Sequence, residues 1–252
     1  AASGTWIEST GDGPWTTTGN WQGGVIASGA DFTADFSTVD LNAAAVNVNY
    51  PGFYRNAVEI NTAPVIGHFV FGDANTSPGS EGGWEVYPPS GSEATNFVTL
   101  SAASPTITVH QLAPINTGDL GALTPELIDD VAFRANLSSA NGLTKLGTGI
   151  LTLTGNGNSL VGSVNVNAGT LRLGTTYGNT GAATYNVASG ATLDVHSGAV
   201  ANINVPAGAT STVRTGASQN VFLSNVVGGG TGTGSTLNLE FSGGEARTYT
   251  AD

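Results

Sequence analysis

The sequence has 252 residues, a net charge of −12 and no cysteine. Its six Lys and Arg residues cannot form the cationic patch that phosphate groups require, which excludes nucleic acid and an anionic membrane surface as partners. The absence of Cys excludes disulfides, thiolate zinc sites and cysteine nucleophiles. The apolar runs are only a few residues long, so we expect no membrane insertion.

The composition indicates a folded, exported protein. Apolar residues make up 39% of the chain, enough for a buried core, whereas charged residues make up only 10%. The small residues at positions 1–4 are typical of a chain that follows signal-peptide cleavage, and an arbitrary boundary is the alternative explanation. Together these features favour a secreted protein that is extracellular or bound to the cell surface.

Residues 1–141 predict short strands without a regular period. Apolar and polar residues alternate in segments separated by Gly, Pro, Asn and Asp, at residues 30–36, 46–48, 66–71, 84–86 and 106–109. We interpret this half as irregular N-terminal coils of a solenoid, and a separate cap domain is the alternative.

One short helix is expected at residues 124–133. Thr124 can serve as the N-cap, Pro125 suits the first turn, and Glu126 complements the helix dipole. The rest of the chain shows no helical period, so the fold class is all-β with at most this one helix.

Residues 142–252 contain an internal repeat. The motif apolar-x-apolar-x-x-Gly occurs at residues 164–169, 185–190 and 203–208, and each copy is followed by a second short strand. The spacing is 21 residues from Val166 to Val187 and 18 residues from Val187 to Val205. This region is therefore predicted to be the regular part of the same solenoid.

The repeat predicts a parallel β-solenoid. Alternation places Leu, Val and Ile on one face of each strand, and such short strands cannot bury that face alone. Coiling the chain gives every strand a parallel neighbour at about 4.8 Å and closes a continuous core. An antiparallel sandwich is the alternative, but it gives no reason for Gly at nearly fixed spacing.

Residues 142–174, GLTKLGTGILTLTGNGNSLVGSVNVNAGTLRLG, closely resemble the autotransporter-associated β-strand repeat of bacterial surface and passenger proteins. The segment Asn20-Trp21-Gln22-Gly23-Gly24 is similar to the Trp-rich start of such proteins. The resemblance implies a right-handed parallel β-helix, export to the cell surface, and a scaffold or adhesive role. The segment departs from the usual pattern at residues 159–162, and the export route stays open.

A β-helical polysaccharide lyase or hydrolase is the enzymatic alternative. A glycosidase needs two facing carboxylates. The candidate acids are Asp31, Asp35, Asp40, Glu126, Asp129 and Asp130. No companion base accompanies them and the cations that a lyase needs are scarce, so we expect no enzyme and no catalytic residues.

No metal or cofactor motif is present in the sequence. His68, His110 and His196 are isolated, and they would converge only if the coil brought them into register. Calcium is conceivable at Asp12 or at Asp31 and Asp35, but neither the EF-hand nor the Gly-rich nonapeptide pattern occurs. We therefore assign no cofactor and no metal ligand.

Self-association is expected at the two ends of the solenoid, because the last coil at each end exposes unpaired strands. The expected self-assembly contacts are Trp6, Trp15, Trp21, Leu237, Leu239, Phe241 and Tyr249. Burial of the three tryptophans under the first coil is the alternative. Aromatic residues Tyr50, Phe53 and Tyr54 are the expected contacts for a glycan or another partner.

The sequence therefore predicts a secreted, non-enzymatic bacterial β-solenoid that associates end to end into an extracellular fibre or matrix. A carbohydrate-binding adhesin module, with extracellular polysaccharide as its partner, is the alternative function.

Overall fold

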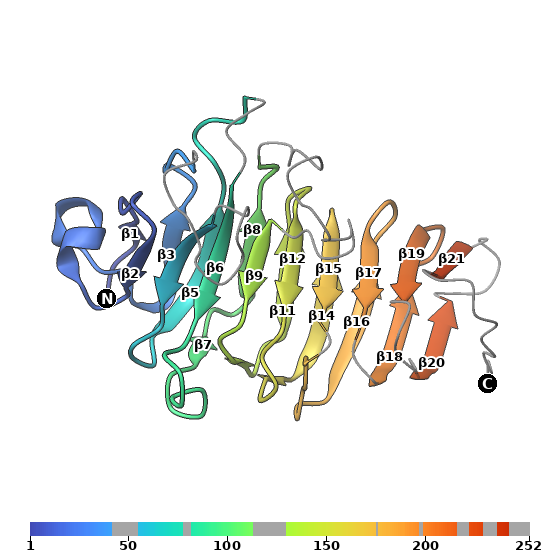
Figure 1. Ribbon diagram of the computed structural model, residues 1–252. Coiled ribbons are helices and arrows are strands. Elements are labelled where there is room, and N and C mark those ends of the chain that lie inside the picture. The colour runs from blue at the N-terminus through green and yellow to red at the C-terminus, as the bar shows by residue number, and fades with distance from the viewer. Residues whose placement is uncertain are drawn as a thin grey trace.

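The chain forms a coil of short parallel strands in the computed structural model (Figure 1). The structure describes residues 1–41, 55–77, 82–112, 130–174, 176–196, 199–215, 222–228 and 236–241. Every ladder between two named strands is parallel. The predicted parallel solenoid is confirmed, and the antiparallel sandwich is excluded.

Two sheets run along the coil. The twelve-stranded sheet contains β1 (Gly4–Thr5), β3 (Gly29–Phe36), β5 (Val65–Phe71), β7 (Val98–Leu100), β8 (Thr106–Val109), β10 (Leu137–Ser139), β11 (Leu143–Leu146), β13 (Ser159–Leu160), β14 (Gly162–Val166), β16 (Ala183–Val187), β18 (Ala199–Val205) and β20 (Phe222–Gly228). The nine-stranded sheet contains β2 (Asp12–Pro14), β4 (Arg55–Glu59), β6 (Gly83–Tyr87), β9 (Val131–Phe133), β12 (Ile150–Leu153), β15 (Thr170–Leu173), β17 (Thr192–Val195), β19 (Thr210–Thr215) and β21 (Thr236–Phe241).

The middle coils have a third side, which no described strand continues beyond Asn179. Strands β7, β10 and β13 pair with one another in a short column, which a bridge between Asn158 and Asn179 extends. Three residues separate the end of β17 at Val195 from the start of β18 at Ala199, whereas nine separate β15 from β16. The shorter connection explains why the repeat shortens from 21 to 18 residues.

Register between coils builds the core. Leu151, Leu171, Leu193 and Val213 are Cα partners on successive strands of the nine-stranded sheet, and all four are fully buried. Burial of each such side chain contributes about 1.5–3 kcal/mol. Because side chains alternate, a slip of one residue would turn this whole row outward.

Close approach of the coils depends on glycine at the corners. Gly142 has φ +73°, a conformation that L side chains rarely adopt. A Cβ atom at this position would lie 2.0 Å from the Ser163 carbonyl oxygen of the next coil. Only glycine satisfies both the turn and the contact.

The N-terminal end is closed by a cluster of aromatic rings. Two short 3₁₀ helices, η1 (Thr18–Asn20) and η2 (Gln22–Gly24), carry the Asn-Trp-Gln-Gly-Gly motif beside the first strands (Figure 1). Trp21 packs edge-to-face on Trp6 at 5.1 Å and on Trp15 at 4.9 Å between ring centroids. The first coil is therefore covered by its own loop, as a solenoid requires.

The predicted helix at 124–133 is wrong where the structure describes it. Residues 124–129 lie outside the described residues, whereas Val131–Phe133 form β9 between β6 and β12. Hydrogen bonds to two neighbouring strands and burial of the strand outweigh the local helix signals. Among the described residues, the helical segments are η1 and η2, and no helix has the length and apolar character needed to cross a membrane.

Candidate functional site

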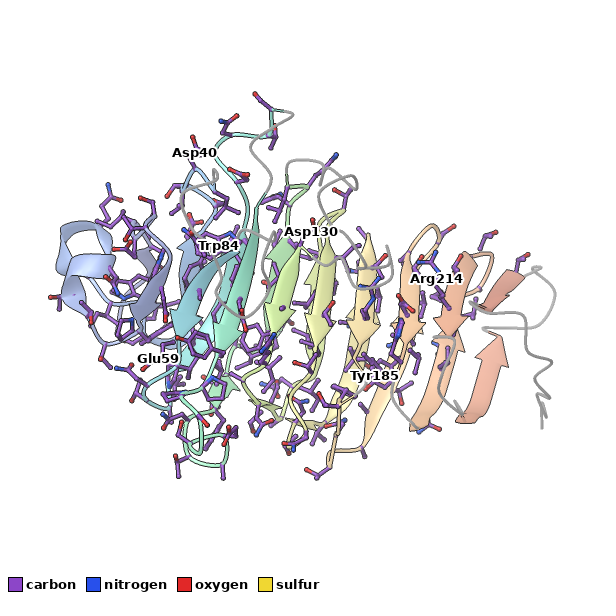
Figure 2. All side chains as sticks on the ribbon, in the orientation of Figure 1. Asp40, Glu59, Trp84, Asp130, Tyr185 and Arg214 are labelled. Atoms are coloured by element: carbon purple, nitrogen blue, oxygen red, sulfur yellow. The ribbon has the colours of Figure 1, made fainter. Side chains whose placement is uncertain are left out.

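The acids considered as catalytic candidates do not converge among the described residues. Asp35 Oδ1 accepts hydrogen bonds from the backbone and hydroxyl of Ser37, and Asp130 Oδ2 accepts one from the Ile150 backbone at 2.6 Å. Asp40 lies on a different coil from Asp130 (Figure 2). Asp31 is exposed on β3. Glu126 and Asp129 lie outside the described residues.

The three histidines lie at separate places on the coil. His68 Nδ1 is 2.9 Å from Thr106 Oγ1, and His196 Nε2 is 2.9 Å from Asp194 Oδ1. His110 is exposed after β8. The described part of the chain contains no group of three or more His, Asp or Glu side chains that could hold a metal ion. Asp12, a candidate calcium ligand, instead accepts a hydrogen bond from the Tyr87 hydroxyl.

The tryptophans predicted to contact a second subunit belong to the core. Trp6, Trp15 and Trp21 are at most 2% exposed, so their rings are not available to a partner. Leu237, Leu239 and Phe241 belong to β21, of which the structure describes the backbone. Tyr50, Phe53, Tyr54 and Tyr249 lie outside the described residues.

Lys145 connects two successive coils from the inside. Its side chain is fully buried, on the inner face of β11 in register with Ile107 and Val166. Its Nζ donates to the carbonyls of Leu146, Gly147 and Ala168 at 3.1, 2.8 and 3.1 Å. Three carbonyls use all three protons of an ammonium group. Burial lowers the pKa of Lys145 to about 8.

Asn158 connects three coils at another corner. Its Oδ1 accepts from the Leu137 backbone at 2.8 Å, and its Nδ2 donates to the carbonyls of Gly155 and Gly178 at 2.6 and 3.0 Å. Asn179, its bridge partner, accepts from the Leu160 backbone through Oδ1. The amide side chains thus replace backbone pairing where the strands end.

A charge row lies on the opposite face of the nine-stranded sheet from the leucine core, and two of its three members, Arg172 and Asp194, are buried. Arg172, Asp194 and Arg214 are Cα partners on β15, β17 and β19. Arg172 Nε is 2.9 Å from Asp194 Oδ2, and Asp194 is only 1% exposed. Burial alone would raise the pKa of Asp194, but the contacts with His196 and Arg172 outweigh burial and hold it below its usual value.

An outer polar row runs along the twelve-stranded sheet. Its members are Cα partners on successive strands and are all half-buried: Thr33, His68, Thr106, Thr144, Asn165, Asn186 and Asn204. Asn204 Nδ2 donates to Asn186 Oδ1 at 2.8 Å, and Asn186 Nδ2 donates to Asn165 Oδ1 at 2.8 Å. Stacked amides therefore form a hydrogen-bonded ladder in the register of the strands.

The clamp, which is the three hydrogen bonds from Lys145 that join two coils, was not predicted from the sequence, although a signal was present. In the segment Leu143-Thr144-Lys145-Leu146, alternation places Lys145 on the same side as the buried Leu143. The pairing of Arg172 with Asp194 could not be predicted without the register of strands that are 22 residues apart.

Comparison with known families agrees with the described fold. Residues 143–173 match the family model of the passenger-associated-transport-repeat, and they run from β11 to β15. The match includes Lys145, Asn158 and Arg172. No curated protein and no solved structure matches the chain. The resemblance of residues 142–174 is therefore confirmed. The chain carries one passenger-associated-transport-repeat at residues 143–173, a repeat that implies a secreted or surface-exposed bacterial protein.

Proposed function

We propose that the chain is a non-enzymatic structural segment of a secreted or surface-displayed bacterial protein. The observation that carries this proposal is the use of its polar side chains. Lys145, Asn158 and the pair of Arg172 with Asp194 all bond from one coil to another. Side chains used in this way hold a rod together rather than bind a substrate. The passenger-type repeat in residues 143–173 supports secretion or surface exposure.

Surface exposure can be tested in the bacterium that produces the chain. Intact cells are treated with a protease that cannot enter them, and the chain is followed with an antibody against the folded solenoid. The proposal expects the chain in the medium or lost from the cells on protease treatment. A chain that stays inside the cells and protected from the protease would refute surface exposure.

The absence of enzymatic activity is a separate proposal with its own test. The purified chain is incubated with a panel of neutral and acidic polysaccharides, and reducing ends and unsaturated products are measured. We expect no product above that of a heat-denatured sample. Cleavage of any member of the panel by the folded chain would overturn the structural proposal.

Self-association into a fibre is the finer proposal. Its support is an open edge: among the described residues, β20 and β21 each pair with a strand on one side only. At the other end, the loop that carries Trp21 covers the first coil, and Trp6, Trp15 and Trp21 are buried beneath it. Contact between two copies at this end would therefore use exposed atoms of the loop rather than the tryptophans. Negative-stain electron microscopy over a concentration series tests this, and dispersed short rods at every concentration would exclude it.

Carbohydrate binding is the second candidate function, and the outer polar row favours it. From Thr106 to Asn204 this row presents hydroxyl and amide groups without a charge, which suits a neutral polysaccharide. Co-sedimentation with insoluble neutral glycans provides the test. Loss of binding in Asn186→Leu, with binding kept in Thr192→Leu on the other sheet, would support this function. Absence of binding to every glycan would refute it.

A further inference from the structure

The sequence contains two Asn-Gly pairs, Asn141-Gly142 and Asn156-Gly157. An Asn-Gly pair is prone to cyclise, because glycine has no side chain to hinder attack by its nitrogen on the preceding amide. Asn156 and Gly157 are both exposed at the corner between β12 and β13. Water and base can therefore reach this pair in the folded chain.

The nitrogen of Gly157 is held by a side chain from the preceding coil. The Gly157 N–H donates to Asn136 Oδ1 at 2.9 Å, and Asn136 Nδ2 donates to the Glu93 carbonyl at 3.0 Å. The Asn156 carbonyl in turn lies against Gly178 of the next coil, where an added Cβ would approach its oxygen to 2.4 Å. The peptide group between Asn156 and Gly157 is thus fixed from both neighbouring coils.

We propose that Asn156-Gly157 is a latent site of spontaneous deamidation and that Asn136 keeps it unreactive while the coils are stacked. In the reaction, base removes the Gly157 N–H proton and the nitrogen attacks Asn156 Cγ. The new N–Cγ bond forms, the Cγ–Nδ2 bond breaks, and Nδ2 takes up the proton that the base removed and leaves as ammonia. Water then opens the succinimide to aspartate or isoaspartate. The hydrogen bond to Asn136 opposes the first step, because it retains the proton and the position of the nitrogen.

Deamidation would leave a permanent covalent change at a corner where the coils have separated. Isoaspartate at residue 156 lengthens the backbone two residues before Asn158, whose side chain contacts Leu137, Gly155 and Gly178. A displaced Asn158 cannot restore these contacts, so the modified corner would not stack again as before. An extracellular rod that is not renewed would accumulate such marks at sites of local opening.

The intact purified chain is incubated at neutral pH, and deamidation at Asn156 is then measured by site-resolved mass spectrometry. Asn141-Gly142 in the same molecules is the internal reference. Because Gly142 is buried, the rate of deamidation at Asn141 reports opening of a different corner of the coil. We expect the folded wild type to react far more slowly at Asn156 than the urea-denatured chain. Equal rates in the folded and denatured chains would overturn the proposal.

Two substitutions separate protection from general stability. Asn136→Ala removes the acceptor for Gly157, and we expect deamidation at Asn156 to become about tenfold faster, the factor that corresponds to one hydrogen bond of about 1.4 kcal/mol. Asn136→Asp keeps an acceptor oxygen and loses only the donor to Glu93, so its rate should stay near that of the wild type. An unchanged rate in Asn136→Ala, or equal acceleration in both variants, would refute the role of Asn136.

Discussion

Lys145 and Ala168 are 23 residues apart in the sequence, yet the Lys145 ammonium donates a hydrogen bond to the Ala168 carbonyl at 3.1 Å. The other two bonds of the ammonium go to Leu146 and Gly147 at the corner of its own coil. One buried side chain therefore joins the same corner of two successive coils. This relationship occurs inside the segment that matches the passenger-associated-transport-repeat.

Substitution Lys145→Met should destabilise the solenoid. Methionine fills the space but donates no hydrogen bond, so three carbonyls lose this donor at a buried corner. We expect a loss of about 2 kcal/mol or more in the free energy of unfolding, measured with urea. Thr144→Ser, one residue away on the outer face, is the matched control and should change the stability much less. Equal stability of Lys145→Met and wild type would contradict the clamp.

Alkaline pH should raise the stability through the same lysine. Burial lowers the pKa of Lys145 to about 8 from its usual 10.5, so between these values the unfolded chain binds more protons than the folded chain. The free energy of unfolding then increases with pH in this window, by up to about 3 kcal/mol. Urea unfolding at a series of pH values tests this, and the increase should be absent in Lys145→Met. A decrease specific to wild type would show that the carbonyls stabilise the ammonium more than burial destabilises it.

Acid should weaken the contacts of Asp194. Its folded-state pKa lies below the usual 3.8, so the unfolded chain takes up protons first as the pH falls. The contribution of Asp194 to the free energy of unfolding is complete above the unfolded-state pKa. It is lost as the pH falls through the lower, folded-state pKa. Asp194→Asn should lower the free energy of unfolding by about 3 kcal/mol at neutral pH, because Arg172 then stays buried without this carboxylate. The variant should also show a weaker dependence of stability on acid, and an unaltered dependence would exclude Asp194 as its source.

The amide ladder predicts an asymmetric response at Asn186. Asn186→Asp keeps the acceptor for Asn204 but replaces the donor to Asn165 by an oxygen, which faces another oxygen. We expect a loss of about 1–2 kcal/mol in thermal or urea unfolding. Thr184→Ser, on the same strand and the same face, is the control. If Asn186→Asp is as stable as this control, the ladder contributes nothing to stability.

Substitutions at two glycines distinguish steric contact between coils from backbone strain. Gly142 and Gly190 have nearly the same φ, +73° and +76°, but a Cβ would meet the next coil at Gly142 and nothing within 4 Å at Gly190. Gly190→Ala should cost about 1–2 kcal/mol, the penalty of a left-handed conformation. Gly142→Ala should cost considerably more, because the backbone of Ser163 must move. Equal losses in differential scanning calorimetry would mean that the coils are not in close contact at Gly142.

Local patterns predicted the strands of the regular half, and they failed where distant residues decide. Alternation identified the strands around Leu151, Leu171 and Leu193, because an inner face of Leu and Val is visible in the sequence itself. Nearby capping residues predict a helix for Val131–Phe133, whereas pairing with β6 and β12 determines their structure. The charge row depends on the register of coils, which the sequence spacing alone does not define. The burial of the three tryptophans likewise depends on the loop that covers them.

The stacking of coils in a fixed register is the central claim, and cysteine cross-linking tests it most directly because the chain has no cysteine of its own. Thr170 and Thr192 are Cα partners on adjacent strands, and so are Thr192 and Thr212. Parallel neighbours lie about 4.8 Å apart, within the range that a disulfide bridges, whereas Thr170 and Thr212 are two coils apart. The double variants Thr170→Cys/Thr192→Cys and Thr192→Cys/Thr212→Cys should form intramolecular disulfides on mild oxidation, and Thr170→Cys/Thr212→Cys should not. Cross-linking of the last pair, or failure of both adjacent pairs, would contradict the account.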